Sequence, residues 1–162
     1  MQIRQATRDD LDRLFELWRE MQYAHIAYHP AYYPLVDPAT AEERVKTRFR
    51  ALIPDAEYCF LVAVEEDQVI GQCLATTQVK LPVYEPVVQL EVLHAVVDPA
   101  HRRKGVFRQL LDAATAWGIE RGAAEVELVV DSLNPAVDAY KACNFEIVHY
   151  KMVRQIDSDR TS

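Results

Sequence analysis

A basic turn around a glycine is the first segment whose residue types could do chemistry. It runs from His101 to Phe107, between an apolar run and an amphipathic stretch, and its cations surround Gly105: Arg102, Arg103, Lys104 and Arg108. The first N–H groups of a helix lack intrahelical partners and carry partial positive charge. A glycine at that position lets a bulky anion approach the backbone closely. The pattern predicts a phosphate-binding helix start, with a solvated basic helix end as the plain alternative.

The sequence around this turn resembles motif A of the GNAT N-acetyltransferase family. Val97-Asp98-Pro99 matches the strand exit of that motif, and Arg102 and Gly105 match two fixed places of its Arg/Gln-x-x-Gly-x-Gly/Ala pattern. Arg103 stands where the family often has Gly, and Phe107 stands at the last small residue. The resemblance implies that backbone amides from about Arg103 to Phe107 hold the pyrophosphate of coenzyme A. The residues expected around it are Arg102, Arg103, Lys104, Gly105, Val106, Phe107 and Arg108.

A second stretch, Asn134 to Glu146, resembles motif B of the same family. Tyr140 and Phe145 fit its pattern, while Asn144 replaces the usual Gly and is the next-best residue for a left-handed helix end. The resemblance implies that Tyr140 is a general acid, because a phenol with a pKa of about 10 is protonated at neutral pH and can donate to a leaving thiolate. A half-buried aromatic residue is the alternative. Asn134 is expected to cap a helix and, by resemblance, to contact the pantetheine arm.

The attacking amine must lose a proton, so a general base or a water relay is needed. Two titratable residues, Glu91 and His94, interrupt the apolar run from Gln89 to Val97. Because side chains alternate along a strand, they are predicted to point to opposite faces of the sheet. Burial would raise the pKa of a Glu toward neutrality, and His titrates near neutral pH unaided. We favour Glu91, which lies where some family members place a catalytic Glu.

The same strand has a second role by resemblance. In the family it separates from the following strand, and the gap admits the pantetheine arm. Unpaired amides near Ala95, Val96 and Val97 would then bond the arm and polarise the thioester carbonyl.

The acceptor site of the family draws on the first two helices and on the loop between the middle strands. Here those segments carry an unusual number of aromatic and imidazole side chains: His25, Tyr28, His29, Tyr32, Tyr33 and Tyr84. Tyrosines can attract a cationic amine through cation–π contact. The favoured alternative is a plain aromatic wall under a mobile loop, and no pattern selects a particular substrate.

Hydrophobic periodicity predicts the elements that must position these residues. Residues 2–6 alternate as a strand, and a Thr7-to-Asp10 capping box precedes a helical stripe from Leu11 to Tyr28. Asp37-Pro38 begins a second helix. Strands are predicted at 58–64, 69–77, 87–97 and 125–130, helices at 104–121 and 134–144, and a closing strand at 145–154 with Val148, Tyr150 and Met152 on one face.

This order, β-α-α-β-β-β-α-β-α-β, predicts the fold class. Hairpin-type strands come first and β-α-β units follow, so we expect an α/β protein with a mixed, mainly antiparallel sheet and helices on both faces. The resemblance makes this a single GNAT-like domain over residues 1–156. Residues 157–162 form a polar C-terminal tail.

Composition excludes several other classes. A net charge of −7 argues against nucleic-acid binding and mildly favours a cationic substrate, although it also serves solubility. The three cysteines, Cys59, Cys73 and Cys143, lack the spacing of a zinc site or a redox pair, so no metal or disulfide is expected. No apolar run reaches the ~18 residues that span a bilayer, and Met1 to Gln5 lacks a signal-peptide core. We expect a cytoplasmic protein without a membrane partner.

The resemblance implies an enzyme that transfers acetyl from acetyl-CoA, as donor substrate, to a primary amine of a small molecule. A protein N-terminus or lysine as acceptor is one alternative, and a non-catalytic acyl-CoA sensor is another. The family also makes a homodimer a prediction to test.

Overall fold

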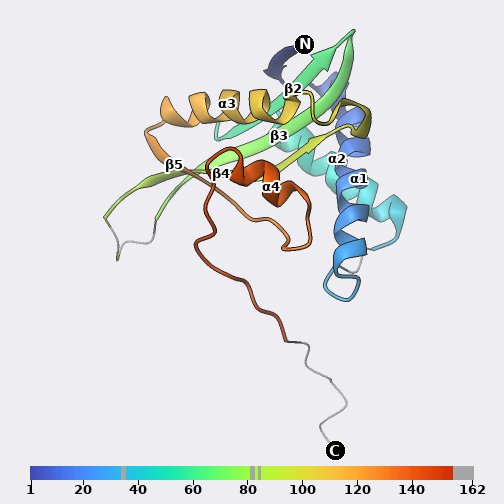
Figure 1. Ribbon diagram of the computed structural model, residues 1–162. Coiled ribbons are helices and arrows are strands. Elements are labelled where there is room, and N and C mark those ends of the chain that lie inside the picture. The colour runs from blue at the N-terminus through green and yellow to red at the C-terminus, as the bar shows by residue number, and fades with distance from the viewer. Residues whose placement is uncertain (34–35, 81–82, 84, 155–162) are drawn as a thin grey trace, which may run out of the picture.

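The five strands of the protein form one mixed sheet in the order β1-β2-β3-β4-β5 (Figure 1). The computed structural model describes residues 1–33, 36–80, 83 and 85–154. The strands are β1 (Gln2–Gln5), β2 (Tyr58–Glu65), β3 (Gln68–Val79), β4 (Val88–Val97) and β5 (Ala123–Leu128). Neighbours from β1 to β4 run antiparallel, and β5 runs parallel to β4. The predicted mixed, mainly antiparallel sheet is confirmed.

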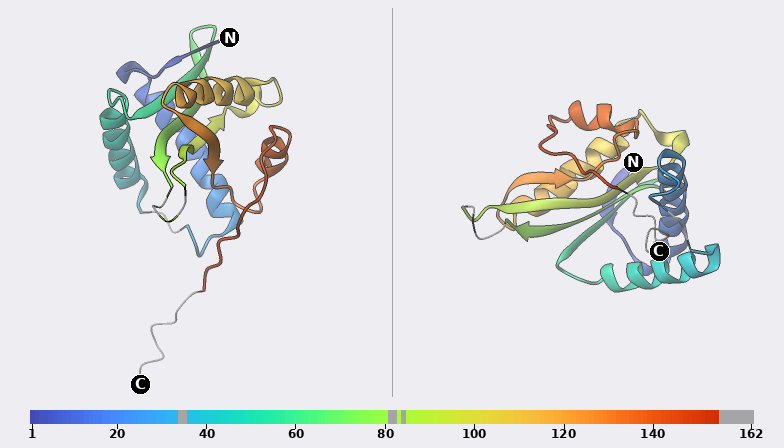
Figure 2. Two further views of the ribbon diagram at one scale, coloured as in Figure 1. Left: turned by 90° about the vertical axis from the view of Figure 1, so that its left-hand side faces the viewer. Right: turned by 90° about the horizontal axis from the view of Figure 1, so that it is seen from below.

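One face of the sheet is covered by the two N-terminal helices, α1 (Leu11–Tyr28) and α2 (Pro38–Leu52) (Figures 1 and 2). The predicted start signals operate: the Asp10 carboxylate accepts from the Thr7 amide at 2.7 Å, and Asp37 caps α2 through the Thr40 amide at 3.0 Å. The apolar stripe of each helix meets the sheet. Phe49 of α2, for example, packs edge-on against Phe60 of β2, with ring centroids 5.0 Å apart.

The other face carries α3 (Val106–Ile119) and α4 (Ala136–Lys141). Leu110 and Ala114 of α3 are fully buried against β2, β3 and β4. Gly118 permits the closest approach, since a Cβ there would lie 3.1 Å from the Leu90 side chain. The helix α3 thus connects β4 to the parallel strand β5. Its packing on the sheet holds the first turn of the helix near the end of β4.

The predicted closing strand at residues 145–154 is wrong. The segment leaves α4 as irregular chain and runs away from the sheet (Figure 1). Val148, Tyr150 and Met152, expected on one face, are 80%, 83% and 92% exposed. An alternating pattern shows only which side chains could share a face. A strand also needs a neighbour for its backbone hydrogen bonds, and no strand of the described residues pairs with this segment.

Among the described residues, no helix is long and apolar enough to cross a membrane. Cys59 and Cys73 are buried thiols within the sheet, and burial raises their pKa values to about 11 and about 12.

Candidate active site

The basic turn begins at the end of β4 and leads into α3 through two residues with left-handed backbone. Asp98 caps a short 3₁₀ turn (Pro99–His101) by accepting from the Ala100 amide at 2.9 Å. Arg103 and Gly105 then take φ values of 62° and 80°. The first helical hydrogen bond of α3 runs from Gln109 N to Gly105 O, and no acidic residue lies in the first turn. The first amides of α3 therefore have no intrahelical partner, which is the geometry that the predicted anion site needs.

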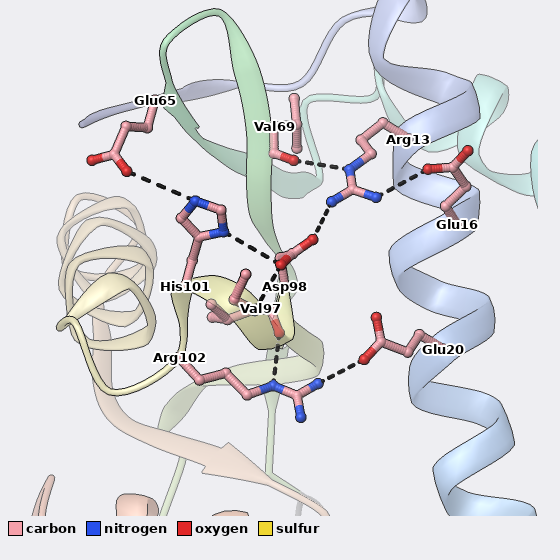
Figure 3. A network of polar contacts seen from close by, with 10 residues as sticks. Arg13, Glu16, Glu20, Glu65, Val69, Val97, Asp98, His101 and Arg102 are labelled. Atoms are coloured by element: carbon pink, nitrogen blue, oxygen red, sulfur yellow. Dashed lines mark hydrogen bonds and ion pairs between the residues drawn. The ribbon is translucent and has the colours of Figure 1, made fainter.

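The cations of the turn divide into two groups. The Arg102 guanidinium points to α1: its Nε donates to Val97 O at 3.0 Å and its Nη2 to Glu20 Oε1 at 2.9 Å (Figure 3). Arg103 and Lys104 are exposed, and neither forms an ion pair in the part of the chain that the structure describes. Arg102 therefore holds the turn in place, while Arg103 and Lys104 remain available to a ligand.

A second network ties the same turn to α1 and also to β3 (Figure 3). Arg13 of α1 pairs with Asp98 and donates from Nε to Val69 O at 3.0 Å. His101 Nδ1 lies 3.3 Å from Asp98 Oδ1. Burial would raise the pKa of Asp98, but the Ala100 amide and the Arg13 guanidinium outweigh it, and the pKa lies below its ordinary value. The turn is thus anchored to α1 and β3 by contacts that sequence reasoning missed.

The predicted separation of β4 from β5 is present. Their pairing runs from Val88↔Ala123 to Val92↔Leu128 and stops there, whereas β4 continues to Val97 with only β3 as its partner. Ala95, Val96 and Val97 therefore present one backbone edge without a neighbouring strand, directly before the basic turn. Such an edge can bond an extended ligand arm by β-augmentation.

Tyr140 lies on α4, whose ends are both formed by the predicted residues. Asn134 Oδ1 accepts from the Ala136 amide at 2.9 Å, and Asn144 ends the helix with a left-handed φ of 64°. The Tyr140 ring meets Phe107 edge-on, with centroids 5.3 Å apart. Burial, with a smaller contribution from Cys73, raises the pKa of Tyr140, so the phenol stays protonated at neutral pH. Phe107, the departure from the family pattern, thus packs against the predicted acid.

Glu91 and His94 lie on the same face of the sheet, and the prediction of opposite faces is wrong. The register of β4 against β3 slips at Leu93, where Leu74↔His94 is followed by Ala75↔Val92. This bulge adds one residue and reverses the alternation beyond it. Glu91 accordingly bonds the Gln78 side chain, and His94 packs against Phe49 and Phe60, all on the face that α1 and α2 cover.

The two base candidates differ in surroundings. His94 is half-buried, but its Nε2 atom is enclosed and has no hydrogen-bond partner among the described residues, and burial, aided by Arg48, lowers its pKa to about 4. Glu91 is half-buried and lies on the stretch of β4 that still pairs with β5. Of the two polar groups, the Nε2 atom of His94 is sealed from solvent, whereas the Glu91 carboxylate forms a solvent-exposed hydrogen bond with Gln78.

The predicted acceptor aromatics cluster at the C-terminal end of α1. His25 stacks on Tyr33 with centroids 5.6 Å apart, and Tyr28 lies 6.0 Å from His25. Tyr32 and Tyr33 meet edge-on. The cluster also contains Asp131, from the connection between β5 and α4, which sequence reasoning did not select. Tyr84 lies outside the described residues.

No group of three or more His, Cys, Asp or Glu side chains in the described ranges could hold a metal ion.

Comparison with known proteins identifies this arrangement. The model of the family described as "Acetyltransferase (GNAT) family" matches residues 11–145. Human N-acetyltransferase 8 is 30% identical over 92 residues, which cover 54% of this chain and 38% of that protein. The match thus spans well under half the length of the curated relative.

Solved structures share the fold. A Bacillus halodurans protein superposes with a TM-score of 0.86 at 21% identity, covering 96% of this chain and 99% of its own. An aminoglycoside N-acetyltransferase in complex with CoA gives 0.69 at 18% identity, covering 96% and 98%. Glucosamine-6-phosphate N-acetyltransferase from Arabidopsis thaliana gives 0.70 at 16% identity, covering 96% and 99%.

Proposed function

Because this chain belongs to the GNAT acetyltransferase family, we propose that it transfers acetyl from acetyl-CoA to a primary amine of a small molecule. One observation carries the donor half of the proposal: β4 loses its β5 partner after Val92 and leads straight into a helix start whose amides are free for an anion. An extended arm ending in a pyrophosphate needs both features, in that order.

The residues of the turn fit such a donor. A Cβ at Gly105 would meet nothing within 4 Å, so the backbone is open to a bulky group. Arg103 and Lys104 would supply charge to the phosphates, together with the amides of Gly105, Val106 and Phe107 and, from the next helical turn, Arg108. Arg102 would act by holding the turn, and Ala95, Val96 and Val97, with Asn134, would line the arm.

Bound acetyl-CoA supplies an acetyl group activated as a thioester. Tyr140 donates its phenolic proton to the sulfur as the C–S bond breaks and the C–N bond to the amine forms. A raised pKa suits this role, because it keeps the phenol protonated at neutral pH and so available as a proton donor. The amide edge of Ala95 to Val97 is placed to polarise the acetyl carbonyl.

The proton of the attacking amine goes to Glu91, directly or through water. His94 is a weaker candidate, because an imidazole whose pKa is about 4 holds a proton poorly at neutral pH. The chemistry named for two fold neighbours, on an aminoglycoside and on a sugar phosphate, supports a small molecule over a protein as acceptor.

Incubation with acetyl-CoA and a panel of amines, followed by the appearance of free thiol, tests the proposal. We expect thiol release that depends on a small amine. Release only with peptides bearing a free N-terminus or lysine would move the acceptor to proteins. Acetyl-CoA binding by calorimetry without turnover on any amine would indicate a sensor, and absence of binding would overturn the proposal.

We further propose residues 1–156 as the enzymatic unit, with the tail 157–162 outside the described residues. A cytoplasmic location and a homodimer remain predictions from the sequence and the family.

A further inference from the structure

Asp131 lies on the β5–α4 connection, next to residues that follow the C-terminal end of α1. Its carboxylate is buried, and the acetyl-transfer scheme does not use it. Its side chain is 5% exposed. Oδ1 accepts from the Leu133 amide at 2.9 Å and lies 3.4 Å from His29 Nε2, and Oδ2 accepts from the Tyr33 hydroxyl at 3.5 Å. No Arg or Lys side chain pairs with it in the described part of the chain. The contacts with His29 and Tyr33 are long, and no permanent cation balances the charge. Burial of such a carboxylate costs free energy unless a ligand supplies the missing partner.

A group of aromatic and imidazole rings lies beside this carboxylate. Tyr33 stacks on His25, and Tyr32 meets Tyr33 edge-on with centroids 4.7 Å apart. Burial lowers the pKa of His25 against the opposing effect of Asp131, so this imidazole is neutral at neutral pH. Burial, followed by the charge of Asp131, raises the pKa of Tyr33. Neutral rings around one negative charge are the surroundings that favour an organic ammonium.

An ammonium of the chain itself already lies against this cluster. Lys151, on the C-terminal segment that leaves the sheet, places its Nζ 5.4 Å from the centre of the Tyr32 ring. A hydrogen bond with Tyr32, followed by charge interaction with it, raises the pKa of Lys151. Within the described residues 145–154, the only cation–π contact is thus the one between the Lys151 ammonium and Tyr32, a member of the aromatic group beside Asp131.

The cluster lies within reach of the acetyl-transfer site. Asp131 comes three residues after Leu128, where β5 stops pairing with β4, and three before Asn134, which starts the helix of Tyr140. Three residues of chain span at most about 11 Å. A small flexible molecule can therefore touch both the strand separation and Asp131.

We propose that Asp131, with Tyr32 and Tyr33, binds a second ammonium group of the acceptor, so that the acceptor is a diamine or polyamine. A carboxylate stabilises the protonated form of an amine, whereas the nitrogen that attacks must be unprotonated. The ammonium held at Asp131 is therefore a different group from the one acetylated. Lys151 occupies the approach to this subsite and competes with the acceptor. This inference rests on the proposed function.

A matched pair of amines tests the subsite. Cadaverine and pentylamine share one carbon chain and differ by one amino group. For the wild type we expect kcat/KM to be about tenfold higher with cadaverine, since a charged hydrogen-bonded partner contributes that much. In Asp131→Asn the cadaverine KM should rise about tenfold while pentylamine kinetics stay within about twofold. The Asn keeps an Oδ1 acceptor for the Leu133 amide, which preserves the turn.

Two controls accompany the test. Asp112→Asn removes an exposed carboxylate of α3 and should leave the preference unchanged. Lys151→Ala should lower the cadaverine KM about threefold, whereas Arg154→Ala in the same segment should not. An Asp131→Asn enzyme that keeps its preference, or that loses activity equally on both amines, overturns the subsite. An unchanged KM in Lys151→Ala overturns the competition.

Binding without turnover separates this inference from the proposed function. Titration of cadaverine into the protein alone, followed by NMR shifts of the tyrosine rings, should saturate in the wild type and weaken about tenfold in Asp131→Asn. If thiol is released with equal efficiency from cadaverine and pentylamine reactions, the proposed acetyl transfer is supported and the proposed subsite is wrong. If the protein does not bind acetyl-CoA, or releases no thiol with any amine, the proposed enzymatic function is wrong instead.

Discussion

The proposed donor region and the proposed acceptor region of this molecule are built in different ways. The donor region, residues 95–108, is made by backbone: a strand edge without a partner, two left-handed residues and the first turn of a helix. The acceptor region is made by side chains that arrive from three separate segments, the end of α1, the β5–α4 connection and the C-terminal segment. The first region thus depends on local backbone geometry, whereas the second depends on how distant segments pack together.

The variant with the largest expected effect is Tyr140→Phe, because Tyr140 packs against Phe107 of the proposed donor region and is the proposed proton donor of the transfer step. We expect kcat to fall about a hundredfold through loss of the proton donor. The affinity for acetyl-CoA should change by less than about twofold, because the ring and its packing against Phe107 remain. Stopped thiol-release assays give kcat and calorimetry gives the affinity. An unchanged kcat would remove Tyr140 from the acid role.

A His94 variant tests whether both titratable residues on the α1–α2 face of β4 take part in catalysis. Its pKa in the folded protein is about 4, below the ordinary His value of about 6.5. The unfolded chain therefore binds more protons between these values, and the stability that comes from keeping His94 neutral is complete above about pH 6.5 and lost as pH falls toward 4.

We accordingly expect the wild type to lose about 2 kcal/mol more unfolding free energy between pH 7 and pH 5 than His94→Phe, whose ring keeps the contacts with Phe49 and Phe60. Urea denaturation at both pH values measures the difference. Turnover of His94→Phe at neutral pH should match the wild type, and a large loss of kcat there would restore His94 as a base.

The same division explains which features the sequence predicts. Caps and turns depend on neighbouring residues alone. The hydrogen bonds that Asp37 and Asn134 accept at helix starts and the left-handed backbone of Asn144 at a helix end are therefore confirmed. The bulge at Leu93 is not local, since it depends on how β4 meets β3, and one extra residue moves Glu91 and His94 onto one face. In the sequence, the only sign that Asp131 belongs to the proposed site is its position between the end of a predicted strand and the Asn-Pro start of a helix.

Gly105→Ala tests the backbone construction of the donor region. Its φ of 80° strains any residue with a Cβ, although the space around it is open, so we expect a loss of about 1–2 kcal/mol in unfolding free energy. Relaxation of that strain would displace the amides of the turn and weaken acetyl-CoA binding about tenfold.

Gly122→Ala is a matched control for this change. Gly122 has a φ of 84° and equally open surroundings, but it lies beyond the far end of α3. It should lose similar stability and keep its affinity for acetyl-CoA. Equal affinity losses in the two variants would show that stability, not the geometry of the turn, sets donor binding.

The smallest expected effects separate the two kinds of arginine in the turn. Arg103→Ala removes an exposed charge and should weaken acetyl-CoA binding about threefold at low salt, with less effect at high salt, because screening reduces the contribution of exposed charges. Arg102→Ala removes the links to Val97 O and Glu20, so it should lower the melting temperature and weaken binding by an amount that salt hardly changes. Arg44→Ala, an exposed arginine of α2, controls for overall charge. Identical salt dependence for Arg102→Ala and Arg103→Ala would contradict the division, because both side chains would then act as charges on the ligand and neither as the support of the turn.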